Sequence, residues 1–341
     1  MSDQAQGLHI HVENRIAQDL VYHVTRERMD GALERHPEIA ARIAATTISY
    51  DLEGFDDAVP TADVIVLPTP VLAEWRPSLY RLAALAPRLK FCFQTGAGAE
   101  KIMPLDWLPD GAVLTNNSGA HAEKAGEFMA MAILMLNNRL PHFITRQKAH
   151  DWDESYATHV GGKTLLVIGV GNMGGAGAAA AKRLGMHVIG VRPSGAPHPA
   201  VDEMATPDRL HEMLPRADFV LCATPLTAET RGMMGRAEFA LMKPTAGLIS
   251  MGRGAVIDND ALAEALSGKK IDGAVIDVTD PEPLPADSPM WDVPNLVITP
   301  HMSSDDTELY IPNTLDVLFE NLRRLLAGEP LLNQVDAARG Y

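Results

Sequence analysis

The stretch Thr164-Leu-Leu-Val-Ile-Gly-Val-Gly-Asn-Met-Gly174 decides the fold, because a short apolar run ends in closely spaced glycines. Such a run is typical of a strand buried on both faces. An alanine-rich segment follows and predicts a helix, and residues 187–191 predict a second strand. The spacing of Gly169, Gly171 and Gly174 lets a backbone turn tightly, approach a pyrophosphate and pack a helix against a strand. We therefore predict a dinucleotide site at the N-terminus of that helix.

The composition indicates a globular protein with room for two ordinary domains, since the chain has 341 residues of which 46% are hydrophobic and 21% charged. A net charge of −15 leaves no basic excess for nucleic acid or an anionic membrane surface. The longest apolar run, nine residues from Phe128, is too short to cross a bilayer. The N-terminal residues lack the pattern of a signal peptide. Cys92 and Cys222 lie in apolar runs and are expected to be buried thiols. We expect a cytoplasmic protein with no metal.

The first third of the chain predicts a small parallel-sheet domain, because strand-like and helix-like segments alternate in it. The expected strands are residues 8–13, 47–50, 62–67, 91–94 and 112–114, and the expected helices lie within residues 25–45 and 76–85. Gly96, Ala97 and Gly98 follow one of these strands. Their backbone N–H groups can meet a substrate carboxylate, or the segment is a simple glycine turn.

Residues 121–138 predict a helix with apolar side chains on nearly every side. Such a helix must be covered all round, either by the core or by a second subunit. We expect the second, and therefore a homodimer. The polar residues 140–162 are expected to form a connection into the glycine-rich unit.

Beyond Arg192 the alternation of strands and helices continues, and polar residues stand where the strands end. Ligands of open α/β sheets bind at the carboxyl ends of the strands. Arg253, Glu282 and His301 follow the expected strands 247–251, 273–278 and 296–299, so we expect them to be functional. An amphipathic helix over residues 311–326 is expected to return to the first domain.

Taken together, these strand ends resemble the D-isomer-specific 2-hydroxyacid dehydrogenases over nearly the whole chain, most strongly from Gly161 to Ser304. The matching segments are Val167-Ile-Gly-Val-Gly-Asn-Met-Gly, Pro225-Leu-Thr-Ala-Glu-Thr-Arg-Gly, Met242-Lys-Pro, Gly252-Arg-Gly-Ala-Val-Ile-Asp, Asp277-Val-Thr-Asp-Pro-Glu-Pro-Leu-Pro and Trp291-Asp-Val-Pro-Asn-Leu-Val-Ile-Thr-Pro-His. The resemblance implies two doubly wound α/β domains. A Rossmann cofactor domain (residues 118–308) is inserted into a flavodoxin-like substrate domain (residues 1–117, with a C-terminal helix in 309–341).

The resemblance also implies an activity, the interconversion of a 2-oxo acid and a D-2-hydroxy acid with hydride from a nicotinamide cofactor. It assigns the substrate carboxylate to Arg253, the acid/base role to His301 paired with Glu282, and a place facing the nicotinamide to Asp277. Further cofactor contacts are expected from Asn172, Met173, Thr224, Pro225 and Gly252. The residue types suit these tasks, because a planar guanidinium binds a carboxylate with two N–H groups. A histidine beside an ionised carboxylate exchanges a proton near neutrality.

The chain departs from the family pattern at the second cofactor-domain strand, where members that use NAD carry an acidic residue. Arg192 stands there, with Ser194 two residues on. A cation and a hydroxyl predict recognition of a 2′-phosphate, and hence NADPH in preference to NADH. The alternative is that Arg192 stacks on the adenine ring and serves both cofactors.

Two further departures concern the substrate and the end of the site. Residues 67–72 lack the arginine of phosphoglycerate-type members, which disfavours a phosphorylated substrate. Asp305 and Asp306 make the segment after His301 more acidic than usual, without an evident role. The sequence leaves the particular 2-oxo acid open.

Other members of the family point to two alternatives. Dinucleotide-sensing corepressors keep the fold but act through partner surfaces and flexible tails, and the sequence shows no such tail before Tyr341. Formate dehydrogenases pair the histidine with glutamine, so Glu282 argues against that reaction.

Overall fold

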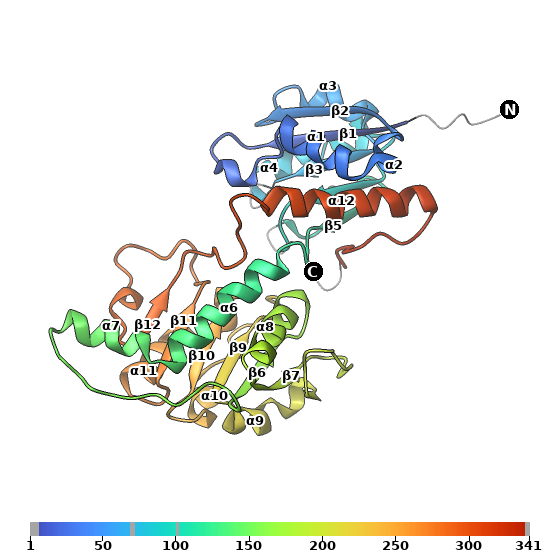
Figure 1. The fold of residues 1–341 in the computed structure, drawn as a ribbon. Helices are drawn as coiled ribbons and strands as arrows, with labels where there is room; N and C mark the ends of the chain where they lie inside the picture. The colour runs from blue at the N-terminus through green and yellow to red at the C-terminus, as the bar shows by residue number, and fades with distance from the viewer. Residues whose placement is uncertain (1–6, 69–71, 100–101, 338–341) are drawn as a thin grey trace. The chain divides into compact units, whose positions relative to one another are not determined.

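The computed structural model describes residues 7–68, 72–99 and 102–337, and the chain divides into two compact units (Figure 1). Unit 1 comprises residues 1–121 and 306–341, and unit 2 comprises residues 122–305. Each unit is built on one parallel β-sheet. The predicted fold class, two doubly wound α/β domains, is thereby confirmed.

The sheet of unit 1 has the strand order β2-β1-β3-β4-β5, which is the flavodoxin-like order. Its strands are β1 (Leu8–Asn14), β2 (Ile43–Tyr50), β3 (Val64–Leu67), β4 (Phe91–Gln94) and β5 (Val113–Asn116). All of their pairings are parallel. Residues 25–45 were expected to form helices broken at His36-Pro37, and two helices, Arg26–Arg35 and Pro37–Ala40, do meet there. The expected end is wrong, because β2 already begins at Ile43.

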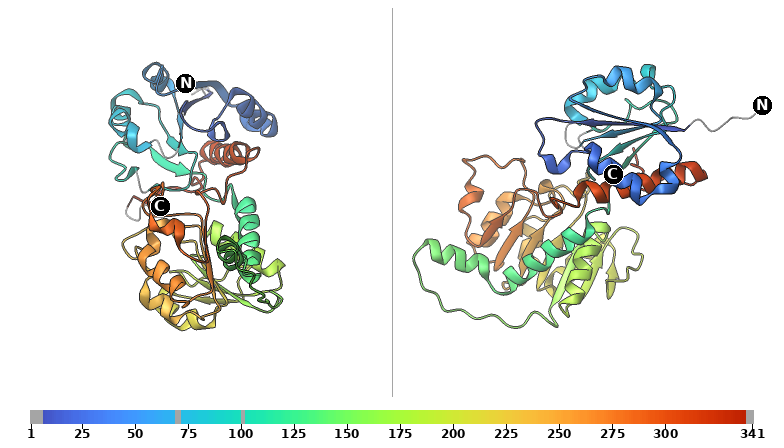
Figure 2. Two further views of the ribbon diagram at one scale, coloured as in Figure 1. Left: turned by 90° about the vertical axis from the view of Figure 1, so that its left-hand side faces the viewer. Right: turned by 45° about the horizontal axis from the view of Figure 1, so that its top comes forward.

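Helices cover both faces of this sheet. They are α1 (Arg26–Arg35), α2 (Pro37–Ala40), α3 (Phe55–Ala58), α4 (Leu72–Leu79), α5 (Leu82–Leu85) and α12 (Tyr310–Ala327). Figure 2 shows α12, close to the C-terminus, beside α1. Ile311 and Leu315 of α12 share a core with Ile10 and Val12 of β1, so the last helix completes the domain that the first strand begins.

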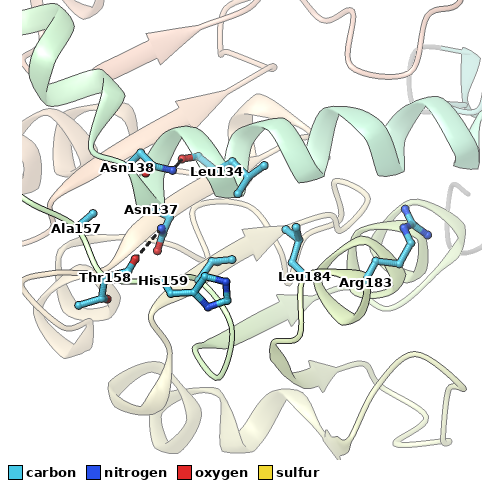
Figure 3. A pocket seen from close by; sticks show the side chains of 9 residues that line it. Leu134, Asn137, Asn138, Ala157, Thr158, His159, Arg183 and Leu184 are labelled. Carbon is cyan, nitrogen blue, oxygen red and sulfur yellow. Dashed lines mark hydrogen bonds between the residues drawn. The ribbon is translucent and has the colours of Figure 1, made fainter.

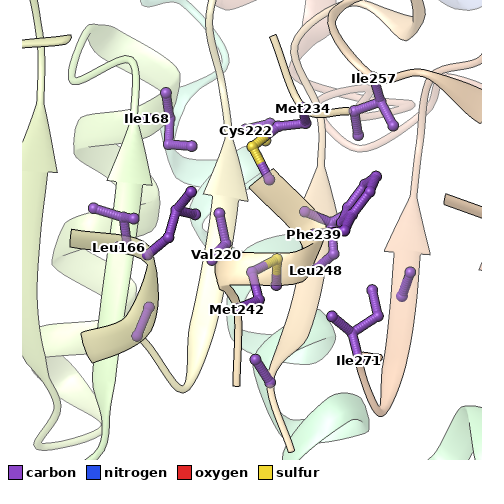
Figure 4. Close-up of a cluster of buried hydrophobic side chains, with 14 of the residues drawn as sticks. Leu166, Ile168, Val220, Cys222, Met234, Phe239, Met242, Leu248, Ile257 and Ile271 are labelled. Atoms are coloured by element: carbon purple, nitrogen blue, oxygen red, sulfur yellow. The ribbon is translucent and has the colours of Figure 1, made fainter. Parts of the chain in front are cut away.

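The sheet of unit 2 has the order β12-β11-β10-β9-β6-β7-β8, the classic dinucleotide-binding order extended by one strand. Its strands are β6 (Thr164–Ile168), β7 (His187–Val191), β8 (Glu203–Ala205), β9 (Phe219–Cys222), β10 (Gly247–Ser250), β11 (Gly273–Ile276) and β12 (Leu296–Ile298). Leu166 and Ile168 face one core (Figure 4), while Leu165 and Val167 face the other. Helices on both faces explain why the central strands are apolar on both sides.

The helices of unit 2 are α6 (Ala122–Asn137), α7 (Leu140–Lys148), α8 (Asn172–Arg183), α9 (Leu210–Met213), α10 (Arg236–Leu241) and α11 (Asn259–Ser267). Helix α7 was expected to be part of a polar connection, and that is wrong for residues 140–148. Pro141 stands in its first turn, where a missing N–H costs nothing. On α6, Met129 and Ile133 are buried while Met131 and Leu134 are 43% and 40% exposed.

Two further findings concern membrane-spanning helices and the cysteines. In the described ranges, no helix is both long and apolar enough to cross a membrane. Cys92 and Cys222 are buried and free. Burial raises the pKa of the Cys222 thiol to about 12, so this thiol stays protonated and unreactive at neutral pH.

Candidate active site

The glycine turn after β6 leads directly into α8 and leaves the N-terminus of that helix accessible. Gly169 has φ +94°, and a side chain there would lie 2.8 Å from the backbone of Ala223. A side chain at Gly174 would lie 2.0 Å from the carbonyl oxygen of Gly169, so the helix packs on the strand only with glycine. At Gly171 a side chain would meet nothing within 4 Å. This open space in front of the first turn of the helix suits a pyrophosphate.

The backbones at the ends of β9, β10 and β11 also approach closely. A side chain at Gly252 would lie 2.5 Å from the carbonyl oxygen of Thr224, and one at Gly254 would lie 2.0 Å from Thr279. The Thr224 hydroxyl is buried and has no hydrogen-bond partner in the described part of the chain. Leaving a buried hydroxyl unpaired is costly, so a ligand that bonds it is stabilised there. These residues therefore fit a dinucleotide.

The side chain of Arg192 folds back onto its own loop. Its guanidinium donates to the carbonyl oxygens of Ala196 (2.9 Å), Pro197 (2.9 Å) and Val170 (3.3 Å). The Ser194 hydroxyl accepts the N–H of Ala196 at 3.3 Å. Three of the five guanidinium N–H groups are therefore used in shaping the loop, which leaves two for a ligand. The sequence pattern did not reveal this structural role.

The catalytic pair predicted at the strand ends is brought together in unit 2. His301 Nδ1 lies 2.6 Å from Glu282 Oε1, and the two side chains are 41% and 38% exposed. The hydrogen bond to Glu282 raises the pKa of His301, while burial and the charge of Arg253 oppose the rise. The pair therefore favours a charged imidazole. Because Nδ1 faces Glu282, Nε2 is the nitrogen left for a substrate.

The loop that carries His301 is fixed by the buried carboxylate of Asp277. This carboxylate accepts the Thr299 hydroxyl at 2.6 Å and the N–H groups of Met302 and Ser303 at 3.0 and 2.9 Å. His301 has φ +52°, an uncommon conformation for a residue with a side chain, and its N–H donates to the Asp277 carbonyl. Strain held by surrounding bonds is typical of functional sites. The expected contact of Asp277 with a nicotinamide stays a prediction.

Arg253 follows β10 and belongs to the same group. Its Nη1 donates to the carbonyl of Gly252 at 2.9 Å. Its charge lowers the pKa of His301. The structure thus gathers Arg253, Glu282 and His301 at the carboxyl ends of neighbouring strands of one sheet.

In unit 1, the segment after β4 has its carbonyl groups tied inward. The Thr95 carbonyl accepts from Tyr310 Oη and from Asn117 Nδ2. The Ala97 carbonyl accepts from Asn116 Nδ2, and the Gly98 carbonyl accepts from Gln94 Nε2. In a trans peptide the N–H points opposite to the carbonyl. The N–H groups of Gly96 and Gly98 therefore point away from these donors. We call residues 95–98 the substrate loop, after the role that the sequence predicts for them.

Sequence reasoning missed the side chains that hold the substrate loop, because they are ordinary polar residues on distant elements. It also left Asp306 unexplained. The Asp306 carboxylate accepts the N–H groups of Glu308 and Leu309 at 2.9 and 2.7 Å, which shapes the turn into α12. An aspartate shortly before a helix is a recognisable start signal, so this role was readable from the sequence. Asp305 donates its N–H to the carbonyl of Met302.

Two further features do not add to this site. The pocket in Figure 3 is lined by Leu134, Asn137, Arg183 and Leu184, among others. It lies at the C-terminal end of α8, whereas the glycine turn lies at the other end of that helix. Within the described ranges, no group of three or more His, Cys, Asp or Glu side chains is arranged to hold a metal ion.

The chain is similar to known proteins along most of its length. Residues 130–303 match the model for the NAD-binding domain of D-isomer specific 2-hydroxyacid dehydrogenases. Glyoxylate/hydroxypyruvate reductase B of Pectobacterium atrosepticum is 34% identical over 226 residues, which cover 64% of this chain and 70% of that protein. D-3-phosphoglycerate dehydrogenase of Methanocaldococcus jannaschii is 32% identical over 255 residues, covering 74% of this chain. The chain spans about half the length of that relative, 48%.

A similar solved structure comes from Xanthobacter autotrophicus. It is a D-isomer specific 2-hydroxyacid dehydrogenase in complex with NADPH and MES. Its sequence is 27% identical, and the two structures superimpose with a TM-score of 0.79 over 99% of this chain and 100% of that one.

Proposed function

Because the chain belongs to the D-isomer-specific 2-hydroxyacid dehydrogenase family, we propose that it is an NAD(P)H-dependent oxidoreductase that interconverts a 2-oxo acid and a D-2-hydroxy acid. The observation that carries this proposal is the 2.6 Å contact between His301 and Glu282, with Arg253 at the end of β10 in the same sheet. A cation and a charged imidazole at strand ends are what carbonyl reduction requires from the protein.

The residues of the site divide the reaction between them. When bound, a reduced nicotinamide supplies hydride to the carbonyl carbon. Arg253 binds the carboxylate and polarises the carbonyl with charge-assisted hydrogen bonds. His301 donates the proton on Nε2 to the oxygen that becomes the hydroxyl, and Glu282 stabilises the imidazolium before that transfer. In the oxidative direction His301 accepts the same proton, so it must then be neutral.

We also propose a carboxylate-binding role for the substrate loop of unit 1, argued from that unit alone. The outward N–H groups of Gly96 and Gly98 are two donors for an anion, and we propose that the N–H of Ala97 between them joins in binding it. We propose a short unphosphorylated 2-oxo acid, since one relative is a glyoxylate/hydroxypyruvate reductase. Residues 67–72, which lack the arginine of phosphoglycerate-type members, give no structural support for or against this substrate, because residues 69–71 lie outside the described residues.

The proposed cofactor is NADPH, with NADH as the weaker alternative. Arg192 ends β7 where a carboxylate would repel a 2′-phosphate, and it keeps two N–H groups after folding its loop. Ser194 lies on the same loop. The similar structure from Xanthobacter autotrophicus holds NADPH.

We further propose a homodimer in the cytoplasm. Met131 and Leu134 leave an apolar strip on α6, and Trp152 and Tyr156 are 89% and 87% exposed in the connection after α7. Exposed apolar patches of this kind are typical of protein contacts. Sedimentation at micromolar concentration should give twice the chain mass, and a stable active monomer would contradict the proposal. Two free buried cysteines suit a reducing compartment, which cell fractionation checks.

A panel of glyoxylate, hydroxypyruvate, pyruvate, phenylpyruvate and branched 2-oxo acids, each with NADPH and NADH, tests the function. We expect oxidation of NADPH with at least one short 2-oxo acid. Tight NADPH binding without turnover on any of them would instead favour a dinucleotide-sensing protein of the same fold.

A further inference from the structure

The carbonyl oxygen of Thr95 is held by side chains from two other parts of unit 1. The Tyr310 hydroxyl donates to it at 3.0 Å although the residues are 215 positions apart, and Asn117 Nδ2 donates to it as well. Tyr310 and Asn117 are only 8% and 1% exposed. The orientation of the Thr95–Gly96 peptide is therefore set from outside the substrate loop.

The ring of Tyr310 has contacts of its own that do not depend on the hydroxyl. It stacks on His121 with ring centres 4.0 Å apart and an interplanar angle of 15°. It meets Tyr22 edge-on at 5.0 Å and 90°. These contacts anchor the first turn of α12. A phenylalanine at position 310 keeps them, so the hydroxyl serves the bond to Thr95 rather than the packing of the helix.

His121 fixes the direction in which Asn117 presents its amide. Asn117 Nδ2 lies 2.9 Å from His121 Nε2, so this ring nitrogen accepts and the imidazole is neutral. Burial lowers the pKa of His121 to about 4, which keeps it neutral at physiological pH. An acceptor on His121 holds the amide nitrogen on the side of the Thr95 carbonyl.

We propose that Tyr310 is a positioning residue for the substrate carboxylate, which acts through the Thr95 carbonyl with Asn117 as its companion. Pulling this carbonyl inward turns the N–H of Gly96 outward, because the two groups point in opposite directions across one peptide plane. The inference rests on the proposed function, which makes a 2-oxo acid the ligand of the loop. Arg253, Glu282 and His301 belong to unit 2, so the proton transfer does not depend on Tyr310.

The test replaces Tyr310 by phenylalanine and uses Tyr80→Phe as a matched control. Tyr80 also lies in unit 1, and its hydroxyl bonds Asp106 at 3.0 Å. For Tyr310→Phe we expect the KM of the 2-oxo acid to rise roughly five- to tenfold, as for the loss of one hydrogen bond. We expect kcat to stay within about twofold of wild type and the Kd of NADPH to stay unchanged. Tyr80→Phe should leave all three at the wild-type values.

Backbone nitrogen relaxation measured by NMR provides a readout that does not depend on turnover. The order parameters of the N–H groups of residues 96–98 should be lower in Tyr310→Phe than in wild type or Tyr80→Phe, with little change in α12. An unchanged KM together with unchanged order parameters would overturn the proposal, and so would a general loss of kcat and thermal stability. If the wild type reduces no 2-oxo acid, the proposed function fails, while the order parameters of residues 96–98 still decide whether Tyr310 positions the loop.

Discussion

At the scale of single residues, the pairing of His301 with Glu282 determines how the activity depends on pH. Glu282 raises the pKa of His301, and reduction needs the protonated imidazole. The kcat/KM for reduction should therefore fall as pH rises through this raised pKa. Glu282→Gln removes the negative charge, so the pKa drops and the falling limb moves to lower pH. A pH profile of kcat/KM measures this, and a limb that stays in place or moves upward would contradict the pairing.

Arg253→Ala should weaken use of the 2-oxo acid while sparing the fold. Loss of the charge-assisted bonds is expected to lower kcat/KM roughly 30- to 1,000-fold, or about 2 to 4 kcal/mol, with the Kd of NADPH nearly unchanged. The matched control is Arg231→Ala, because Arg231 is an exposed arginine of unit 2 whose nearest acidic partner, Asp280, lies 3.8 Å away. Turnover that is equal in the two variants would show that Arg253 does not bind the substrate.

At the scale of elements, Arg192 shapes the loop after β7, and we propose that it also binds the cofactor. Arg192→Ala should raise the KM of NADPH roughly ten- to hundredfold, because a contact to a charged phosphate is worth about 1.5 to 3 kcal/mol. The KM of NADH should change only a few-fold, which reports the part due to the loop bonds. Arg209→Ala, an exposed arginine paired with Glu212, is the control. Equal losses for both cofactors would mean that Arg192 only shapes the loop.

His121, which stacks on Tyr310 at the start of α12, should make unit 1 less stable in acid. The folded pKa of His121 is about 4, below the unfolded value of about 6.5. The unfolded chain therefore binds the extra proton first as pH falls, and stability is lost between about pH 6.5 and 4. The loss is at most about 3 kcal/mol. His121→Phe keeps an aromatic ring on Tyr310 and should flatten this dependence. Denaturant unfolding at pH 7 and 4.5 measures the loss of unfolding free energy between these two pH values. An equal loss in wild type and His121→Phe would show that His121 is not the cause.

The elements themselves differ in how far the sequence predicts them. Buried strands such as β6 and β9 are predictable, because an apolar run ending in glycine or threonine has few other meanings. Helix α7 was missed because its exposed face is polar and its start is signalled only by Pro141. The early start of β2 was missed because Ile43 and Ala44 fit a helix equally well by composition. Tertiary pairing with β1 decides in favour of the strand.

At the scale of the whole molecule, the candidate site was predictable where function lies at strand ends. Arg253, Glu282 and His301 each follow a strand, and a parallel sheet brings such ends to one edge. Tyr310 and Asn117 were not predictable, because nothing in a local pattern shows that α12 returns to Thr95 across 215 positions. Asp277 itself was singled out in the sequence, but the support that its buried carboxylate gives the His301 loop was not predictable, because these contacts are visible only in three dimensions.

The central claim is that this chain reduces a 2-oxo acid with His301 as the proton donor. The most direct measurement is NADPH oxidation by wild type and by His301→Ala, with the panel of 2-oxo acids and identification of the hydroxy acid formed. The account predicts turnover of a short 2-oxo acid to the D-2-hydroxy acid, and a loss of roughly 100- to 10,000-fold in kcat for His301→Ala, with NADPH binding retained. A wild type that forms no hydroxy acid, or a variant that forms it as fast as wild type, would contradict the account.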